Sequence, residues 1–184
     1  MEEKLSGTLA IDLGNTNTVI AFQDQENINS VLVEIPNITL SPGVIPTAVW
    51  FDGTTSIPKI GTSALKMRDN LNSDLFFHSN FKRLIGNSIE KINQNNILNP
   101  NECGKKFFQI LWANIPHKYE IKRLVLTAPI DTYKGYREWL VNLCEEIPVD
   151  EIALVDEPTA ASLGINIPFG SKIMTLDIGG STVD

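Results

Sequence analysis

Residues 11–17 read Ile-Asp-Leu-Gly-Asn-Thr-Asn, and residues 176–182 read Leu-Asp-Ile-Gly-Gly-Ser-Thr. Each stretch closes an apolar, strand-like run with an Asp, places a Gly two residues later and continues with small hydroxyl, amide or Gly residues. Glycine allows positive φ and close backbone approach, and successive backbone N–H groups in such a turn form a nest that binds anions. The repeat therefore predicts two related hairpins that bind phosphate groups from opposite sides.

The two carboxylates of the repeat, Asp12 and Asp177, cannot bind phosphate directly because both groups are negative. A cation between them removes the repulsion, so we expect both residues to hold Mg²⁺ through its water ligands. The amide and hydroxyl side chains of the two turns add donors to the backbone N–H groups. A single Asp-x-Gly turn is common in proteins without a nucleotide, so this prediction depends on the second copy.

The rest of the chain alternates between strand and helix patterns. Strands are expected at 8–13, 18–22, 31–35, 48–51, 123–128, 152–155 and 173–176, and helices at 63–71, 103–115, 132–146 and from 157 onward. The Asn-rich segment 75–101 is weakly periodic and is expected to be irregular with short helices. Closely spaced early strands indicate antiparallel pairing, and the later alternation indicates an α/β protein with a mixed sheet.

The composition limits the classes of function. The chain has 184 residues, of which 42% are apolar and 20% charged, and its formal net charge is −7. Small basic clusters and an acidic balance argue against a nucleic-acid partner. No apolar run is long enough to cross a membrane, and the N-terminus lacks a basic region of the signal-peptide type. Two cysteines indicate a reduced, cytoplasmic protein.

Five ordered motifs resemble the superfamily of sugar kinases, DnaK-type chaperones and actin, and within it the DnaK-type chaperones. The two Asp-x-Gly turns are similar to the phosphate hairpins of that superfamily. Three further stretches resemble DnaK-type elements: Phe81-Lys82-Arg83-Leu84-Ile85-Gly86, Leu126-Thr127-Ala128-Pro129 and Val155-Asp156-Glu157-Pro158-Thr159-Ala160-Ala161-Ser162. A weaker likeness covers residues 43–49, so the resemblance extends over nearly the whole chain.

The resemblance implies an α/β fold: an actin-like ATPase (ribonuclease H-like) lobe with a mixed five-stranded sheet flanked by helices, plus an inserted smaller α+β subdomain. Residues 1–44 and 119–170 are expected to form the core subdomain of lobe I, and residues 45–118 the inserted subdomain. Residues 171–184 are expected to be the first strand and phosphate hairpin of a second lobe, most of which lies beyond this chain.

The resemblance also implies the roles of individual residues, with ATP or ADP and Mg²⁺ as cofactors. Asp12 and Asp177 hold the magnesium shell. Lys82 points at the γ-phosphate and the attacking water, and Glu157 binds a metal-bound water or orients the nucleophile. Pro129 and Arg137 resemble the relay to a substrate-binding domain. The phosphates are bound by the two hairpins: Gly14, Asn15, Thr16 and Asn17 on one side, and Gly179, Gly180, Ser181 and Thr182 on the other.

The implied function is ATP hydrolysis that drives protein-folding cycles in a full-length chaperone, with client proteins and cochaperones as partners. We expect the isolated chain to be inactive, because the adenosine-binding loops of the second lobe are not part of it. An unpaired apolar strand at 173–176 also invites a strand-exchanged dimer. The histidines, cysteines and tryptophans are interpreted as structural: His78, His117, Cys103, Cys144, Trp50, Trp112 and Trp139.

Some positions depart from the family pattern and keep alternatives open. Asn15 and Asn17 stand where the family has Thr and an aromatic residue, and Ser181 replaces a Gly. Asp131 and Thr132 replace an aromatic pair after Pro129. The alternatives are an actin-like filament protein and a pseudo-ATPase that binds nucleotide as a switch without hydrolysis. A small-molecule kinase is a further alternative, although no sugar-kinase signature surrounds a catalytic Asp here.

Overall fold

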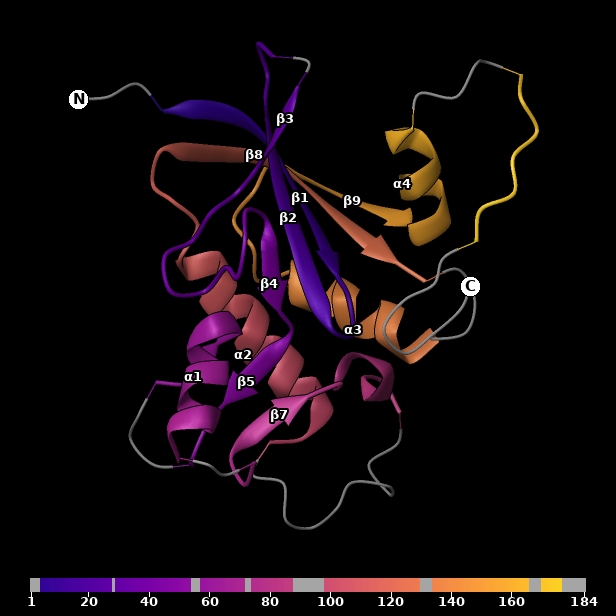
Figure 1. Cartoon of the computed structure of the whole chain (residues 1–184). Helices are drawn as coiled ribbons and strands as arrows, with labels where there is room; N and C mark the ends of the chain where they lie inside the picture. Colours follow the sequence, from indigo (N-terminus) through magenta and orange to yellow (C-terminus); the bar gives the residue numbers. More distant parts are fainter. Residues whose placement is uncertain are drawn as a thin grey trace.

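The fold is centred on a mixed β-sheet with the strand order β3-β2-β1-β8-β9 (Figure 1). The computed structural model describes residues 4–27, 29–53, 57–71, 74–87, 98–129, 134–165 and 170–176. The bounds of these strands are β1 (Leu5–Leu13), β2 (Asn17–Asp24), β3 (Ser30–Leu32), β8 (Tyr119–Ala128) and β9 (Glu151–Asp156). β1, β2 and β3 pair antiparallel, whereas β8 and β9 extend the sheet in parallel. The expected mixed α/β sheet is confirmed.

A sixth strand, β4 (Val44–Pro46), also pairs antiparallel with β2, beside the position of β3. The sequence pattern did not indicate it, because a three-residue strand containing a proline has no periodicity of its own. The expected strand at 31–35 is shorter in the structure, where β3 ends at Leu32.

A second, three-stranded antiparallel sheet has the order β6-β5-β7, with bounds β5 (Ala48–Trp50), β6 (Lys59–Ile60) and β7 (Phe77–Ser79). Helix α1 (Gly61–Leu71) packs against it (Figure 1). β7 lies in the Asn-rich segment that was expected to be irregular, and it forms because its partner β5 supplies the hydrogen bonds. The short 3₁₀ helix η1 (Lys82–Leu84) follows β7 and contains Lys82, one of the predicted site residues. The subdomain boundaries at 44/45 and 118/119 stay predictions.

Three further α-helices complete the described part: α2 (Pro100–Ala113), α3 (Lys134–Cys144) and α4 (Glu157–Gly164). α2 begins three residues earlier than the apolar pattern indicated. Asn99 caps its first turn by accepting the N–H of Glu102, whose side chain accepts the N–H of Asn99 in return. Pro100 occupies the first turn, where a missing N–H costs no hydrogen bond.

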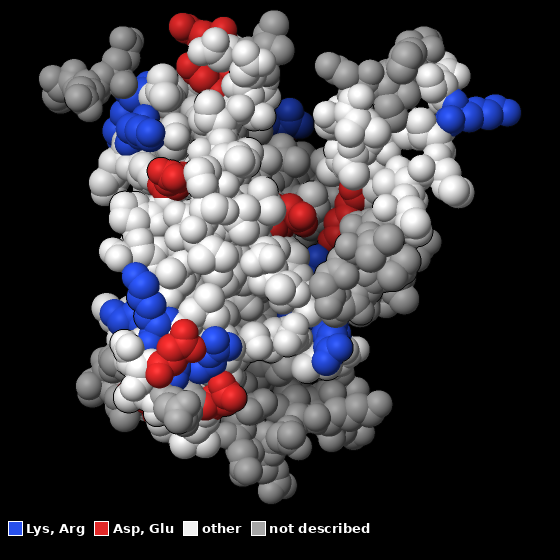
Figure 2. Space-filling view, in the orientation of Figure 1, with Lys and Arg blue, Asp and Glu red and all other residues white. Residues whose placement is uncertain are grey.

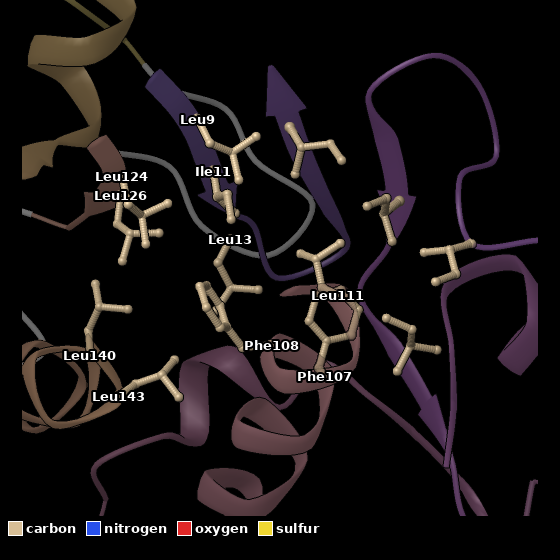
Figure 3. Close-up of a cluster of buried hydrophobic side chains, with 14 of the residues drawn as sticks. Leu9, Ile11, Leu13, Phe107, Phe108, Leu111, Leu124, Leu126, Leu140 and Leu143 are labelled. Atoms are coloured by element: carbon tan, nitrogen blue, oxygen red, sulfur yellow. The ribbon is translucent and has the colours of Figure 1, made fainter. Parts of the chain in front are cut away.

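The hydrophobic core lies between the main sheet and helices α2 and α3 (Figure 3). Alternate side chains of β1 and β8 face these helices, and they meet apolar residues of α2 and α3: Leu9, Ile11, Leu13, Leu124, Leu126, Phe107, Phe108, Leu111, Leu140 and Leu143. Burying one such side chain stabilises the fold by about 1.5–3 kcal/mol. Val49 and Ile60 of the second sheet belong to the same buried cluster, so the two sheets share one core.

The expected strand at 173–176 is absent, which corrects the prediction. Residues 171–176 have no regular secondary structure, and Met174 is 94% exposed. The run Ile-Met-Thr-Leu is apolar enough for a strand, but within the described ranges no sheet edge pairs with it. Thr175 Oγ1 lies 2.8 Å from Ser162 Oγ of α4, so a side-chain hydrogen bond links this segment to α4.

The structure also tests the expected structural role of the tryptophans and His78, and the expected lack of a membrane span. Trp50 is buried, and Trp112 and Trp139 pack against the core, as expected for structural residues. His78 is buried in β7. Among the residues that the structure describes, no helix combines the length and apolarity that crossing a membrane requires.

Candidate functional site

The candidate site lies at one edge of the main sheet, where three neighbouring parallel strands end. β1, β8 and β9 run in the same direction, so their carboxyl ends meet at this edge. Asp12 is near the end of β1, Thr127 near the end of β8, and Glu157 directly follows β9. In open α/β sheets, ligands bind in the crevice outside the carboxyl ends of the strands. The topology thus brings together two of the predicted site residues, Asp12 and Glu157.

Asp12 is held in place by a neighbour that the sequence did not single out. Thr127 donates its hydroxyl to Asp12 Oδ1 at 2.6 Å. This contact follows from the sheet register, in which Ile11 pairs with Leu126, so the next residues of the two strands adjoin. Asp12 and Thr127 are half-buried, in contrast to the fully buried Ile11 and Leu126 beside them. A carboxylate oriented in this way suits Mg²⁺ bound through water, because one of its oxygens is already fixed.

Lys82 and Glu157 form an ion pair, with Nζ 2.7 Å from Oε1. The two residues are 75 positions apart, and their side chains are only 13% and 16% exposed. The sequence predicted both residues for the site, but nothing in it indicated that they touch. Desolvating both charges largely offsets their attraction, so such a pair adds little to stability and mainly fixes geometry.

Tyr136 lies beneath this pair and was missed by the sequence analysis. Its ring centroid is 5.4 Å from Lys82 Nζ, and its side chain is fully buried. Burial raises the pKa of the Tyr136 phenol far above its usual range, and the charges of Glu157 and Asp12 raise it further. The phenol therefore stays neutral and lies within electrostatic reach of both carboxylates. No motif marks Tyr136, since an isolated Tyr on an apolar helix face looks like any core residue.

The first predicted phosphate turn links β1 to β2. The N–H of Gly14 donates to the carbonyl oxygen of Asp12 at 3.1 Å, and a Cβ at Gly14 would collide with the backbone of Asn17. Thr16 and Asn17 are exposed. Asn15 donates its amide to Asn80 Oδ1 at 2.8 Å, which ties the turn to the loop before η1. The first predicted phosphate turn is therefore tight, partly exposed and adjacent to Asp12.

Asp177, Gly179, Gly180, Ser181 and Thr182 lie outside the described residues, as do Asp131 and Thr132. Within the described ranges, no group of three or more His, Cys, Asp or Glu residues could hold a metal ion by itself.

Beside the site, Arg137 of α3 pairs with Asp156 at 3.2 Å. Both side chains are more than a third exposed, so the pair contributes little to stability. It places the predicted relay residue Arg137 next to the residue that precedes Glu157. Figure 2 shows a hollow in the surface between the body of the molecule and the part that carries α4, with acidic side chains visible in it.

Comparison with known proteins identifies relatives along nearly the whole chain. No protein-family model matches it. The chain is 29% identical to the chaperone protein DnaK of Metamycoplasma hominis, over 96% of this chain and 29% of that protein. It is 29% identical to the DnaK of Thermosipho melanesiensis, over 100% of this chain and 30% of that protein. For the DnaK of Cyanidium caldarium the identity is 26%, over 99% of this chain and 32% of that protein.

These similarities confirm the resemblance to DnaK-type chaperones. The chain spans less than a third of the length of the relatives it matches.

Proposed function

Since nearly the whole chain is similar to DnaK-type chaperones, we propose that it forms the phosphate-binding side of a chaperone ATPase domain. In the full-length protein this domain binds Mg-ATP and hydrolyses it, which drives cycles of client binding and release. The observation that carries the proposal is the convergence of Asp12 and the Lys82–Glu157 pair at one strand edge. We further propose that the protein acts in the cytoplasm together with cochaperones.

The proposed division of labour follows from the charges of the site. Asp12, oriented by Thr127, would hold Mg²⁺ through water, and the positive charge needed beside the phosphates would come from this ion. The backbone N–H groups and side chains of Gly14, Asn15, Thr16 and Asn17 bind phosphate oxygens on one side. Gly179, Gly180, Ser181 and Thr182 are proposed to do so on the other, with Asp177 as the second carboxylate. We propose that lobe I consists of a core subdomain (residues 1–44 and 119–170) and an inserted subdomain (residues 45–118).

Lys82 and Glu157 are proposed to act on the terminal phosphate and the attacking water. Lys82 presents a preorganised cation to the negative charge of the phosphoryl group, and Glu157 orients water as a hydrogen-bond acceptor. No covalent intermediate on the protein is needed, because phosphoryl transfer to water depends on positioning and electrostatics. The short Lys82–Glu157 contact keeps both groups at the edge before a nucleotide binds.

The experiment that tests the proposal uses the longest natural protein containing this chain. Wild-type protein and the Asp12→Asn variant are compared in calorimetric titrations with ATP, with and without Mg²⁺. We expect the wild type to bind Mg-ATP more tightly than metal-free ATP, and Asp12→Asn to lose most of this difference. The matched control is Asp24→Asn, a change of the same kind at a half-buried position at the end of β2, where its register partner is Gly7 and not Asp12. Equal Mg²⁺ dependence in wild type and Asp12→Asn would contradict the proposal.

A second candidate is a nucleotide switch that binds ATP without hydrolysing it. The observation that favours it is the Asn15–Asn80 hydrogen bond. In this bond the Asn15 side-chain amide donates to another residue of the protein, although the proposed ATPase would use this amide to bind phosphate. Single-turnover measurements with radiolabelled ATP separate the two functions. Release of labelled phosphate supports the ATPase, and bound, uncleaved ATP supports the switch.

A further inference from the structure

The aromatic ring of Tyr136 is placed to hold the ammonium group of Lys82. Lys82 Nζ lies 5.4 Å from the ring centroid and 2.7 Å from Glu157 Oε1, so the cation is confined between a π face and a carboxylate. A lysine side chain has four rotatable bonds and otherwise samples many positions. A cation over an aromatic face is attracted by the ring quadrupole, and more strongly when water is largely excluded, as it is around this side chain.

A glycine–glycine contact sets the distance between the two elements that carry these residues. Gly86 follows η1, and Gly135 directly precedes Tyr136 in α3. A Cβ on Gly135 would lie 2.7 Å from Gly86 Cα, so neither position has room for a side chain. Gly86 also has a positive φ of 78°, which other residues rarely adopt. The two backbones therefore touch, and the Lys82 turn is fixed against the start of α3.

Asn101 of α2 strengthens this junction from the other side. Its Oδ1 accepts the backbone N–H of Gly86 at 2.9 Å, and its carbonyl oxygen accepts the indole N–H of Trp139 at 3.3 Å. The Trp139 ring in turn packs on Tyr136, with centroids 5.6 Å apart. Three elements thus hold the ring of Tyr136 still relative to the Lys82 turn.

We propose that Tyr136 is the positioning residue of Lys82, acting through its ring face. The effect of this contact on catalysis rests on the proposed function, whereas the contact itself does not. The alternative is that Tyr136 only fills the core. Packing requires the shape of the ring and is indifferent to its electrons, whereas holding a cation requires the negative face of the ring. The two roles therefore respond differently to changes that keep shape and withdraw electrons.

The first arm of the test measures Lys82 directly in this chain, without nucleotide. A ring under the ammonium shifts the NMR signals of the Lys82 ε-methylene protons upfield. We expect Tyr136→Phe to retain this shift and Tyr136→Leu to lose it, with Lys105 of α2, which pairs with Glu146, as the internal control lysine. Unchanged Lys82 signals in a folded Tyr136→Leu variant would overturn the proposal.

The second arm measures turnover in the longest natural protein that contains this chain. Position 136 is replaced by phenylalanine and by phenylalanines with one, two and three ring fluorines, which keep nearly the same shape. We expect kcat to fall stepwise along the series, to about a tenth of the phenylalanine value, with KM for ATP nearly constant. A flat series would overturn the positioning role. Because these variants preserve packing, the test stands even if Tyr136→Leu fails to fold.

The two arms separate the inference from the proposed function. If the wild-type protein neither binds nor hydrolyses ATP, the proposed function fails, and the NMR arm still decides whether the Tyr136 ring lies against the Lys82 ammonium. If the Lys82 signals respond as expected while the fluorine series is flat, the ring contact exists but has no part in the reaction, and the proposal is wrong.

Discussion

Lys82 shows how strongly the surroundings determine what a single residue does. In the sequence it is one of 15 Lys and Arg residues. In the structure its ammonium is paired with Glu157, rests on the face of Tyr136 and is largely shielded from water. Lys105 pairs with Glu146 as well, but both of those side chains are nearly half exposed. A shielded cation acts on a nearby phosphate with little screening, whereas an exposed one is screened by water and salt.

We predict that Lys82→Ala slows ATP hydrolysis about 10²–10³-fold in the longest natural protein containing this chain, while nucleotide binding is largely retained. The reason is the loss of a preorganised cation at the terminal phosphate, comparable to the loss of an oxyanion-hole donor. Steady-state phosphate release and calorimetry measure the two quantities. Lys105→Ala is the matched control, and unchanged turnover in Lys82→Ala would refute the role.

The two cysteines give a second prediction at the residue scale. Burial raises the pKa of Cys103 to about 12 and that of Cys144 to about 11. A raised pKa means that less reactive thiolate is present at pH 8, since the proton leaves only at higher pH. We expect iodoacetamide to alkylate both thiols at least ten times more slowly in the folded chain than in urea. Mass spectrometry measures the rates; equal rates would show that the thiols are not shielded.

At the scale of elements, local sequence sets where helices begin. α2 starts at Pro100, directly after its cap Asn99, because the side chains of Asn99 and Glu102 each accept the other residue's backbone N–H. The apolar spacing alone indicated a later start, since a capping box contains only polar residues. β7 is the opposite case: its three residues carry no signal, and the strand exists only because β5 lies beside it.

We predict that Asn99→Ala lowers the free energy of unfolding by about 1 kcal/mol, because it removes the cap of α2 and leaves an N–H of the first turn without its acceptor. Asn70→Ala, an exposed position near the end of α1, should change the free energy of unfolding by less than about 0.5 kcal/mol. Chemical denaturation followed by circular dichroism measures both. A cost for Asn99→Ala no larger than that of the control would contradict the capping role.

At the scale of the whole molecule, the two sheets are joined by one buried core. Val49 and Ile60 of the second sheet lie in the same cluster as Leu9 of the main sheet, and α2 packs between them. Phe107 of α2 is completely buried in this cluster. A core shared in this way makes the unfolding of one sheet expose apolar surface of the other, so the two should unfold together.

We predict that Phe107→Ala lowers the free energy of unfolding by about 3–5 kcal/mol, because it removes a buried ring and leaves a cavity. Single-tryptophan variants that keep either Trp50 or Trp139 report on the second sheet and on α3, respectively. Both probes should show one transition with the same midpoint, shifted equally by Phe107→Ala. Leu40→Ala, at a 62% exposed position, is the control. Two separate midpoints would show that the sheets unfold independently.

The sequence by itself determined the mixed α/β class, most strands of the main sheet and most of the helices, and the residues Asp12, Lys82 and Glu157 as site candidates. These features depend on local patterns: apolar periodicity, turn residues and short ordered motifs. Only the tertiary structure decided that Thr127 orients Asp12, that Lys82 and Glu157 touch, and that Tyr136 lies beneath them. It also decided that residues 173–176 do not form a strand. Such contacts join residues far apart in the chain, and a strand needs a partner edge whose position is set by the whole fold, so neither leaves a signal in the local sequence.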